Sequence, residues 1–128
     1  MRVMKKVSLL LSLALFTSFF AFAQQAKKEL RHVVMFGWKP GADSAAINQV
    51  VMAFKALPGK IKTIKRFEWG INNSPENLNQ GLTHCFLVTF ASEKDRNDYL
   101  VNPDHKAFTK LLPGIMEKVT VVDYWAQQ

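Results

Sequence analysis

The segment Tyr99-Leu-Val-Asn-Pro-Asp-His105-Lys-Ala-Phe108 contains the end of one predicted helix, a proline break and the start of another helix. The Pro103 ring removes a backbone donor and clashes with the preceding turn, so one straight helix cannot run through the segment. The break brings Tyr99 and His105 onto two short helices that meet at a bend. A phenol and an imidazole can share a proton with a substrate near neutral pH. We therefore expect the catalytic residues, if the protein is an enzyme, to lie in this segment.

Four stretches elsewhere alternate apolar and polar side chains in the manner of strands. They lie at residues 30–38, 63–69, 82–90 and 119–125. With the helical regions between them, the order is strand, helix, strand, strand, helix, strand. This order predicts an α+β, ferredoxin-like βαββαβ fold with a four-stranded antiparallel sheet. The sheet face without helices is substantially apolar, which predicts a homodimer whose two sheets close into a dimeric α/β barrel.

Capping residues predict where the helices begin and end. Asp43 or Ser44 is expected to cap the first helix, and Pro58-Gly59 to stop it. Ser92 is expected to cap the second helix, and Asp104 the piece that follows the proline break.

The N-terminus has the pattern of a secretory signal peptide. Three basic residues within the first six positions precede an almost wholly apolar stretch at 7–22 and the small-x-small motif Ala21-Phe22-Ala23. This predicts a signal peptide at 1–23, one domain at 24–128, and a periplasmic or secreted protein that is not held at a membrane after cleavage. An uncleaved N-terminal anchor is the alternative.

Charge and cysteine content exclude other classes of protein. Removal of the three basic residues lowers the formal net charge from +7 to +4, and the remaining basic residues are interspersed with acidic ones. We therefore expect no nucleic-acid partner. Cys85 is the single cysteine, which excludes an intramolecular disulfide, and its strand-like surroundings indicate a buried apolar filler rather than a nucleophile.

An ordered set of short motifs resembles the stress-responsive α/β-barrel (Dabb) domain family over essentially the whole mature chain. The motifs are Arg31-His32-Val33-Val34, Leu57-Pro58-Gly59, Trp69-Gly70, Gly81-Leu82-Thr83-His84 and the segment from Tyr99 to His105. The resemblance implies a dimeric ferredoxin-like barrel. Some members have no known chemistry, whereas one plant member is a polyketide cyclase.

The resemblance also implies roles for individual residues. In the cyclase, a tyrosine and a histidine that match Tyr99 and His105 act together on the substrate, and two further histidines match His32 and His84. The chain differs at Asn102, where the cyclase has a histidine, so an identical substrate is not expected.

The chemistry of this pair requires neither a metal nor a cofactor. His105 would take a proton from an activated carbon as general base, and Tyr99 would donate a hydrogen bond to the enolate oxygen that develops. The alternative is structural, with Tyr99 packed on the sheet and His105 bonded to backbone at the bend.

The other histidines can be ranked by topology. Because the first and third strands are antiparallel neighbours, His32 and His84 should lie at opposite ends of the sheet. We predict that the second helix brings Tyr99 toward His84, which would then join the pair in place of His32. The three histidines are too widely spread along the chain to predict a zinc site.

Apolar residues predicted on the helix-facing side complete the candidate site. Val34, Phe36, Phe86 and Phe108 would serve either as core or as the lining of a pocket for a small apolar or aromatic ligand. The function classes left open are a binding module, a cyclase- or lyase-type enzyme, and a structural stress protein; a haem-degrading barrel is more remote. A cavity of a few hundred cubic ångströms beside Tyr99 and His105 would favour the first two classes.

Overall fold

The structure is a computed structural model that describes residues 27–127, so the predicted signal peptide lies outside the described residues. The elements are β1 (Leu30–Trp38), α1 (Ser44–Lys60), β2 (Arg66–Ile71), β3 (His84–Phe90), α2 (Glu93–Val101), α3 (Pro103–Thr109) and β4 (Met116–Trp125). The predicted ferredoxin-like order is confirmed, with the second helical region divided into α2 and α3.

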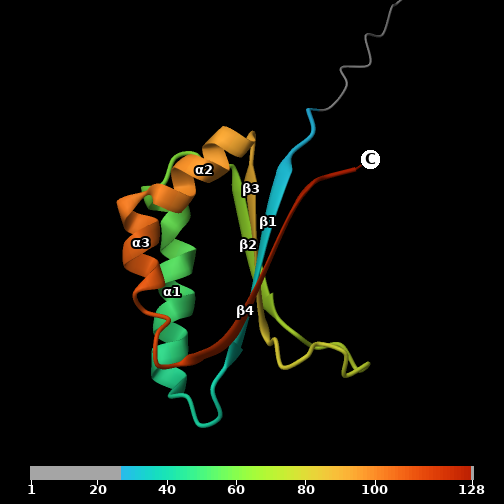
Figure 1. Ribbon diagram of the computed structural model, residues 1–128, viewed down its shortest axis with the longest axis vertical. Coiled ribbons are helices and arrows are strands. Elements are labelled where there is room, and N and C mark those ends of the chain that lie inside the picture. Colours follow the sequence, from blue (N-terminus) through green and yellow to red (C-terminus); the bar gives the residue numbers. More distant parts are fainter. Residues whose placement is uncertain (1–26, 128) are drawn as a thin grey trace, which may run out of the picture.

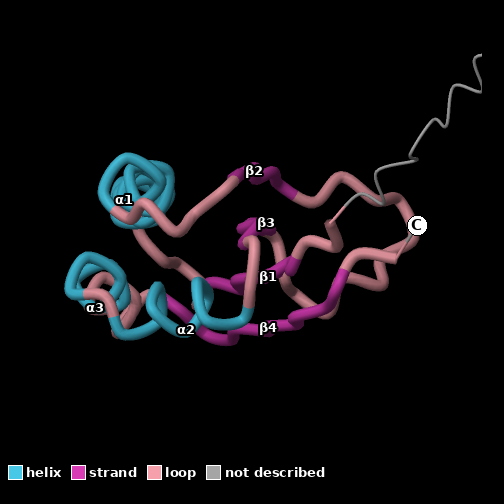
Figure 2. Tube along the Cα trace, turned by 90° about the horizontal axis from the view of Figure 1, so that it is seen from above, coloured by secondary structure: helices cyan, strands magenta, loops and turns pink. Residues whose placement is uncertain are grey.

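The four strands form one antiparallel sheet in the order β2-β3-β1-β4. The three helices lie together on one side of this sheet (Figure 1). Seen from above, α1 and α3 lie next to each other while α2 extends toward β4 (Figure 2). Within residues 27–127, no helix covers the opposite face of the sheet, as the strand and helix order predicts.

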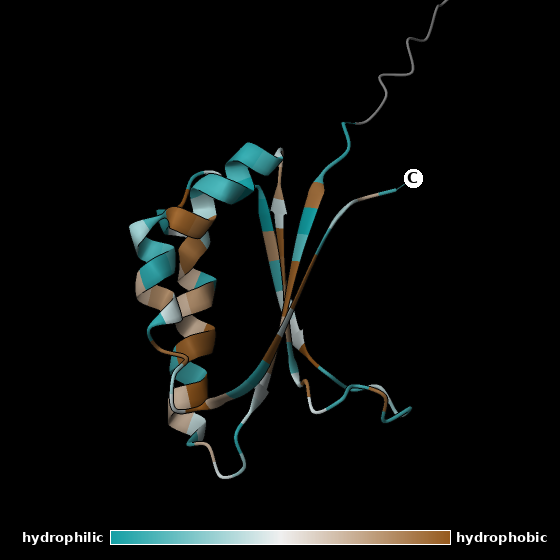
Figure 3. Cartoon of the chain, viewed as in Figure 1, coloured by the Kyte–Doolittle hydropathy of each residue, from teal (hydrophilic) through white to brown (hydrophobic). Residues whose placement is uncertain are grey.

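The core lies between the sheet and the helices. Alternate β1 residues point toward the helices, and Leu30, His32, Val34 and Phe36 are all buried there. Hydrophobic residues run along the strands and along α1, whereas α2 is hydrophilic over most of its surface (Figure 3). Tyr99 is the one buried residue of α2, so this helix contributes a single anchor to the core.

The first helix does not stop at Pro58-Gly59 as predicted but ends at Lys60. Pro58 lies in the last turn, where its missing donor affects only one helical hydrogen bond. Gly59 does not adopt the left-handed conformation that ends many helices. Ile61 follows as the C-terminal cap, and its N–H donates to the carbonyl oxygen of Leu57.

Two of the three predicted caps are confirmed. Asp43 accepts from the N–H of Ala45, and Ser92 accepts from the N–H of Asp95. The prediction for Asp104 is wrong, because Asn102 caps α3 by accepting from the N–H of Asp104 at 2.8 Å. Pro103 occupies the first helical position, which suits its fixed φ and missing donor, so the cap must be the residue before it.

Three strands differ from their predicted bounds, because hydrogen bonding to the neighbouring strand sets where each begins and ends. The second strand spans 66–71 instead of 63–69, the third begins at His84, and the fourth begins at Met116, which pairs with Trp38. Cys85 is exposed, contrary to the expected buried filler, because it lies in phase with the sheet face that carries no helix.

The sheet face without helices is substantially apolar. Its side chains include Val33, Met35, Leu87, Val122 and Tyr124. Val122 and Tyr124 are 48% and 47% exposed in the single chain. Across residues 27–127, no helix has the length and apolar character needed to cross a membrane.

Candidate functional site

A cavity of about 360 Å³ lies between the helix-facing side of β1 and β4 and the helices α2 and α3. The predicted residues that line it are His32, Val34, Phe36, Tyr99, His105 and Phe108. The lining residues that sequence reasoning missed are Phe54, Arg96, Asn97, Leu100, Thr109, Leu112, Val119, Val121 and Asp123. The volume is in the range of small-molecule sites.

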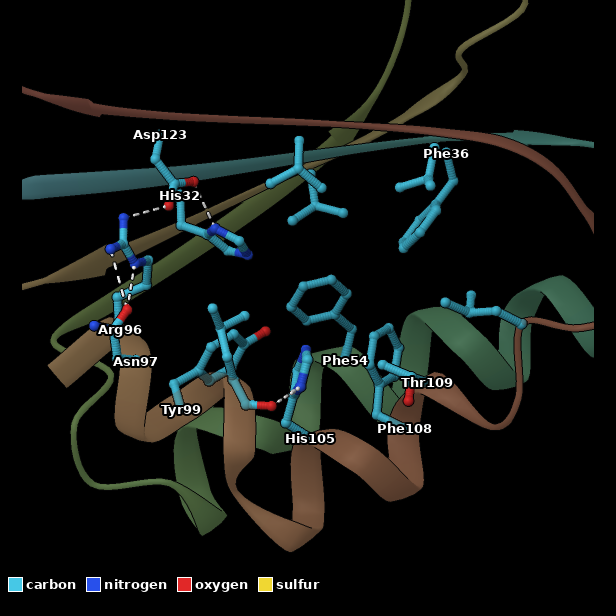
Figure 4. A pocket seen from close by; sticks show the side chains of 15 residues that line it. His32, Phe36, Phe54, Arg96, Asn97, Tyr99, His105, Phe108, Thr109 and Asp123 are labelled. Atoms are coloured by element: carbon cyan, nitrogen blue, oxygen red, sulfur yellow. Dashed lines mark hydrogen bonds and ion pairs between the residues drawn. The ribbon is translucent and has the colours of Figure 1, made fainter. Parts of the chain in front are cut away.

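Tyr99 and His105 come together at this cavity. Their ring centroids are 4.4 Å apart, and both side chains face the same hollow (Figure 4). The Tyr99 hydroxyl is buried and has no hydrogen-bond partner among the described residues. Such a group is destabilising unless something binds it, because it has lost its bonds to water.

The backbone fixes the proton on the His105 ring. Nδ1 lies 3.1 Å from the carbonyl oxygen of Leu100. A carbonyl only accepts, so Nδ1 carries the hydrogen, and in the neutral ring Nε2 carries the lone pair. Burial lowers the pKa of His105 from its ordinary value, the bond to Leu100 partly opposes this, and nearby His32 adds to the lowering. The ring is therefore neutral near pH 7 and available as a base.

Tyr99 has the complementary property. Burial raises the pKa of the Tyr99 phenol above its ordinary value, so the hydroxyl keeps its proton at neutral pH. A protonated phenol beside a neutral imidazole forms a donor–acceptor pair directed at one space.

The prediction that His84 joins this pair is wrong, and His32 does so instead. The His32 and Tyr99 ring centroids are 5.7 Å apart, and His32 lines the cavity. Its Nδ1 lies 2.7 Å from Oδ1 of Asp123. Because a carboxylate accepts, Nδ1 carries a hydrogen, and Nε2 is the ring nitrogen that points into the hollow (Figure 4).

The error has a geometric cause. The six residue steps from Glu93 to Tyr99 advance only about 9 Å along the helix. The six steps from Phe90 back to His84 along β3 span about 20 Å. Tyr99 therefore stays near Phe90, where α2 begins. The start of β1 lies at that end of the sheet, and this places His32 within reach.

His84 belongs to a different neighbourhood. Its Nδ1 accepts a hydrogen bond from the indole N–H of Trp38 at 3.0 Å, and its ring also lies against Trp69. It borders a second cavity of about 500 Å³ under the loop between β2 and β3. Burial lowers the pKa of His84, but Tyr99 and His105 are not near it.

Phe86 also lies outside the cavity. It is fully buried and stacks on Phe54, with ring centroids 4.4 Å apart. Phe86 is therefore core, whereas Val34, Phe36 and Phe108 have both roles, since they are buried and form part of the cavity wall.

The most informative residues that sequence reasoning missed are Arg96 and Asp123. Nη1 of Arg96 lies 2.8 Å from Oδ2 of Asp123, so the carboxylate joins α2 to the ring of His32. Arg96 resembles a solvated helix residue in the sequence, and its partner is 27 positions away. No local pattern signals such a contact. Among residues 27–127, no group of three His, Cys, Asp or Glu side chains could hold a metal ion.

Comparison with known proteins identifies relatives of the whole domain. The model of the family described as Stress responsive A/B Barrel Domain matches residues 30–126. The stress-response A/B barrel domain-containing protein HS1 of Arabidopsis thaliana is 35% identical over 79% of this chain and 93% of its own length. Olivetolic acid cyclase of Cannabis sativa is 26% identical over 74% of this chain and 94% of its own.

Solved structures of similar fold include further relatives of this kind. A hydroxynitrile lyase from Passiflora edulis superposes with a TM-score of 0.74 and 25% identity, covering 80% of this chain and 96% of its own. A dimeric protein of unknown function with a ferredoxin-like fold from Bacteroides fragilis superposes with a TM-score of 0.63 and 26% identity, covering 77% and 96%.

Proposed function

Because this chain belongs to the stress-responsive A/B barrel (Dabb) domain family, we propose that it acts on a small, mainly apolar carbonyl compound by general acid–base catalysis. His105 is the base, and Tyr99 donates a hydrogen bond to the oxygen of the substrate. The observation that carries the proposal is the buried Tyr99 hydroxyl, which has no partner among the described residues and lies beside a neutral imidazole at a cavity. The similarity to a protein named as a cyclase and to one named as a hydroxynitrile lyase supports the proposal.

The lining of the cavity determines how the ligand lies. Tyr99, His105 and His32 provide polar atoms at one end, and phenylalanine and valine side chains form the wall toward Phe36 and Val119. A ligand with an oxygen at one end and an apolar or aromatic body fits this division. The carbonyl oxygen then lies at the Tyr99 hydroxyl and the reacting proton at Nε2 of His105.

In enolate formation, Nε2 of His105 takes the proton from the carbon next to the carbonyl. The carbon–hydrogen electron pair moves to form the enolate, and the Tyr99 hydroxyl donates a hydrogen bond to the developing oxygen anion. The imidazolium then returns the proton to carbon, or the enolate attacks a second carbonyl and the imidazolium protonates the alkoxide that forms; either route restores the neutral base. The step requires no outside oxidant or reductant.

Cleavage of a hydroxynitrile uses the same two groups. His105 takes the hydroxyl proton, the oxygen–hydrogen electron pair forms the carbonyl, and the carbon–carbon pair leaves with cyanide. The imidazolium then gives this proton to cyanide, which leaves as hydrogen cyanide, while the Tyr99 hydroxyl donates a hydrogen bond to the carbonyl oxygen throughout.

Mandelonitrile, an aromatic hydroxynitrile, tests this activity through the ultraviolet absorbance of released benzaldehyde. We expect His105→Ala to lower the rate at least about a hundredfold, the usual contribution of a general base. His84→Gln is the matched control, since this histidine lies at the second cavity. A loss of less than tenfold in His105→Ala would exclude the base role. If the wild type does not cleave mandelonitrile, the remaining functions are the enolate reaction, a binding module and a structural stress protein.

The proposal includes a homodimer and export. The apolar sheet face and the dimeric neighbour from Bacteroides fragilis support a dimer in which two sheets pack face to face. The basic, apolar and small-residue pattern of the first 23 residues supports cleavage after Ala23 and a periplasmic or secreted location. N-terminal sequencing of the protein purified from its native host tests the cleavage site.

A further inference from the structure

Asp123 is held from two sides at the polar end of the cavity. One carboxylate oxygen accepts from Nδ1 of His32 at 2.7 Å, and the other accepts from Arg96 at 2.8 Å. The Asp123 side chain is 23% exposed, so without a second partner its carboxylate could rotate toward water. The Arg96 bond removes that alternative.

Arg96 is itself fixed before it reaches Asp123. Its Nε and Nη2 both donate to Oδ1 of Asn97, at 3.2 and 3.1 Å. This fork orients the guanidinium plane and reduces the side-chain entropy that a single ion pair would cost. Figure 4 shows the resulting chain of contacts, from Asn97 through Arg96 and Asp123 to His32, across one end of the cavity.

This contact differs from an ordinary surface ion pair. Helix α2 packs on β3 and α3. The Arg96–Asp123 ion pair adds a contact between α2 and the edge strand β4. Only 20% of the Arg96 side chain is exposed, whereas the Lys94–Asp98 pair on the same helix is exposed at 82% and 50%. A partly desolvated pair is screened less by water and salt than an exposed one.

We infer that Arg96 is a positioning residue that acts through Asp123 to hold Nε2 of His32 in the cavity, as an acceptor for a hydroxyl group on the substrate. The substrate of the proposed reaction is then a carbonyl compound that carries a second, hydroxyl, group. The carbonyl lies at Tyr99 and His105, and the hydroxyl donates to His32, whose ring centroid is 5.7 Å from that of Tyr99. The substrate part of this inference rests on the proposed function; the positioning part does not.

Long-range proton–nitrogen NMR of the imidazole rings tests the positioning in the protein without ligand. We expect His32 to show a single form with its hydrogen on Nδ1 in the wild type, and a mixture of the two tautomers in Arg96→Met. Lys94→Met removes the exposed pair of the same helix and should keep the wild-type spectrum. If Arg96→Met does not fold, Asp123→Ala replaces it and should also give a mixture. A single Nδ1–H form in the folded variant would overturn the positioning role.

Paired ligands test the substrate class. In the wild type and in Lys94→Met, 3-hydroxyacetophenone should bind about fivefold more tightly than acetophenone, a difference typical of one hydrogen bond. In Arg96→Met the two dissociation constants should become equal. An unchanged ratio in Arg96→Met would overturn the hydroxyl assignment. If neither ketone binds the wild type, the proposed function and the hydroxyl assignment both fail, while the tautomer measurement still decides the positioning role.

Discussion

At the scale of single residues, the site combines three polar side chains, each of which has one polar atom that faces the cavity and has no protein partner within residues 27–127. His105 is bonded to a backbone carbonyl and His32 to a carboxylate, so each ring directs Nε2 at the cavity. Tyr99 has no such partner among the described residues. An unpaired buried hydroxyl lowers stability, and this cost is expected where the group serves a ligand instead of the fold.

Tyr99→Phe should therefore separate stability from function. Removing the unpaired hydroxyl should leave the free energy of unfolding unchanged or raise it by up to about 1 kcal/mol, while cleavage of mandelonitrile falls at least tenfold. Urea unfolding and the rate assay measure the two effects. Tyr124→Phe, on the exposed tyrosine of the other sheet face, is the control for both. A Tyr99→Phe variant that loses more than about 1 kcal/mol would show that the hydroxyl supports the fold.

The pH dependence follows from the direction of the His105 shift. Its pKa lies below the ordinary value because burial disfavours the charged ring. The base form thus persists into acid, and the rate should fall only below pH 6.5, the ordinary histidine value. The same preference makes stability greatest above pH 6.5 and reduces it as pH falls through the lower folded pKa. A pH–rate profile of the wild type with its midpoint above 6.5 would contradict the assignment.

At the scale of elements, the bend between α2 and α3 sets the position of His105. Asn102 ends α2 and caps α3, and Pro103 follows as the first residue of the new helix. The segment therefore changes direction within one residue. Tyr99 precedes the bend and His105 follows it, so their separation depends on this cap.

Asn102→Ala should lower the free energy of unfolding by about 1 kcal/mol, the usual cost of losing an N-terminal cap. Asn102→Asp keeps the accepting oxygen and should retain most of the stability. Asp104→Ala, which removes only an acidic side chain from the first turn, should cost less than about 0.5 kcal/mol. Chemical unfolding curves of the three variants test the order; a larger loss in Asp104→Ala than in Asn102→Ala would favour the cap predicted from the sequence.

Sequence patterns predicted the elements well because strand alternation and capping are local properties. The first strand and the Ser92 cap were predicted from residues a few positions apart. The choice between His32 and His84 depends on the rise per residue, which is shorter in a helix than in a strand. The prediction of His84 took α2 to reach further along the sheet than it does. The Arg96–Asp123 contact joins α2 to β4, and no pattern of neighbouring residues in the sequence indicates it. Asn102 was predictable, because proline favours the first position of a helix.

At the scale of the whole molecule, the two faces of the sheet differ in what covers them. The helix-facing side carries the core and the cavity, and the other side exposes apolar residues that the described part of a single chain leaves uncovered. If two copies pair through the second face, each cavity remains within its own chain.

Val122→Lys tests this pairing. A charge on the apolar sheet face should be buried without a partner in the dimer, which is costly, so the variant should sediment as a monomer where the wild type sediments as a dimer. Val101→Lys changes an equally apolar, 63% exposed residue on α2 and should remain dimeric. A dimer that is retained in Val122→Lys would place the interface elsewhere.

The most direct test of the central claim, that His105 and Tyr99 act together on a carbonyl compound in the cavity, is proton exchange on acetophenone in deuterated water. Proton NMR follows the loss of the methyl signal as deuterium replaces hydrogen next to the carbonyl. We predict that the wild type accelerates this exchange over buffer and that His105→Ala and Tyr99→Phe abolish most of the acceleration. Exchange at the buffer rate in the wild type, or an equal acceleration in both variants, would contradict the claim.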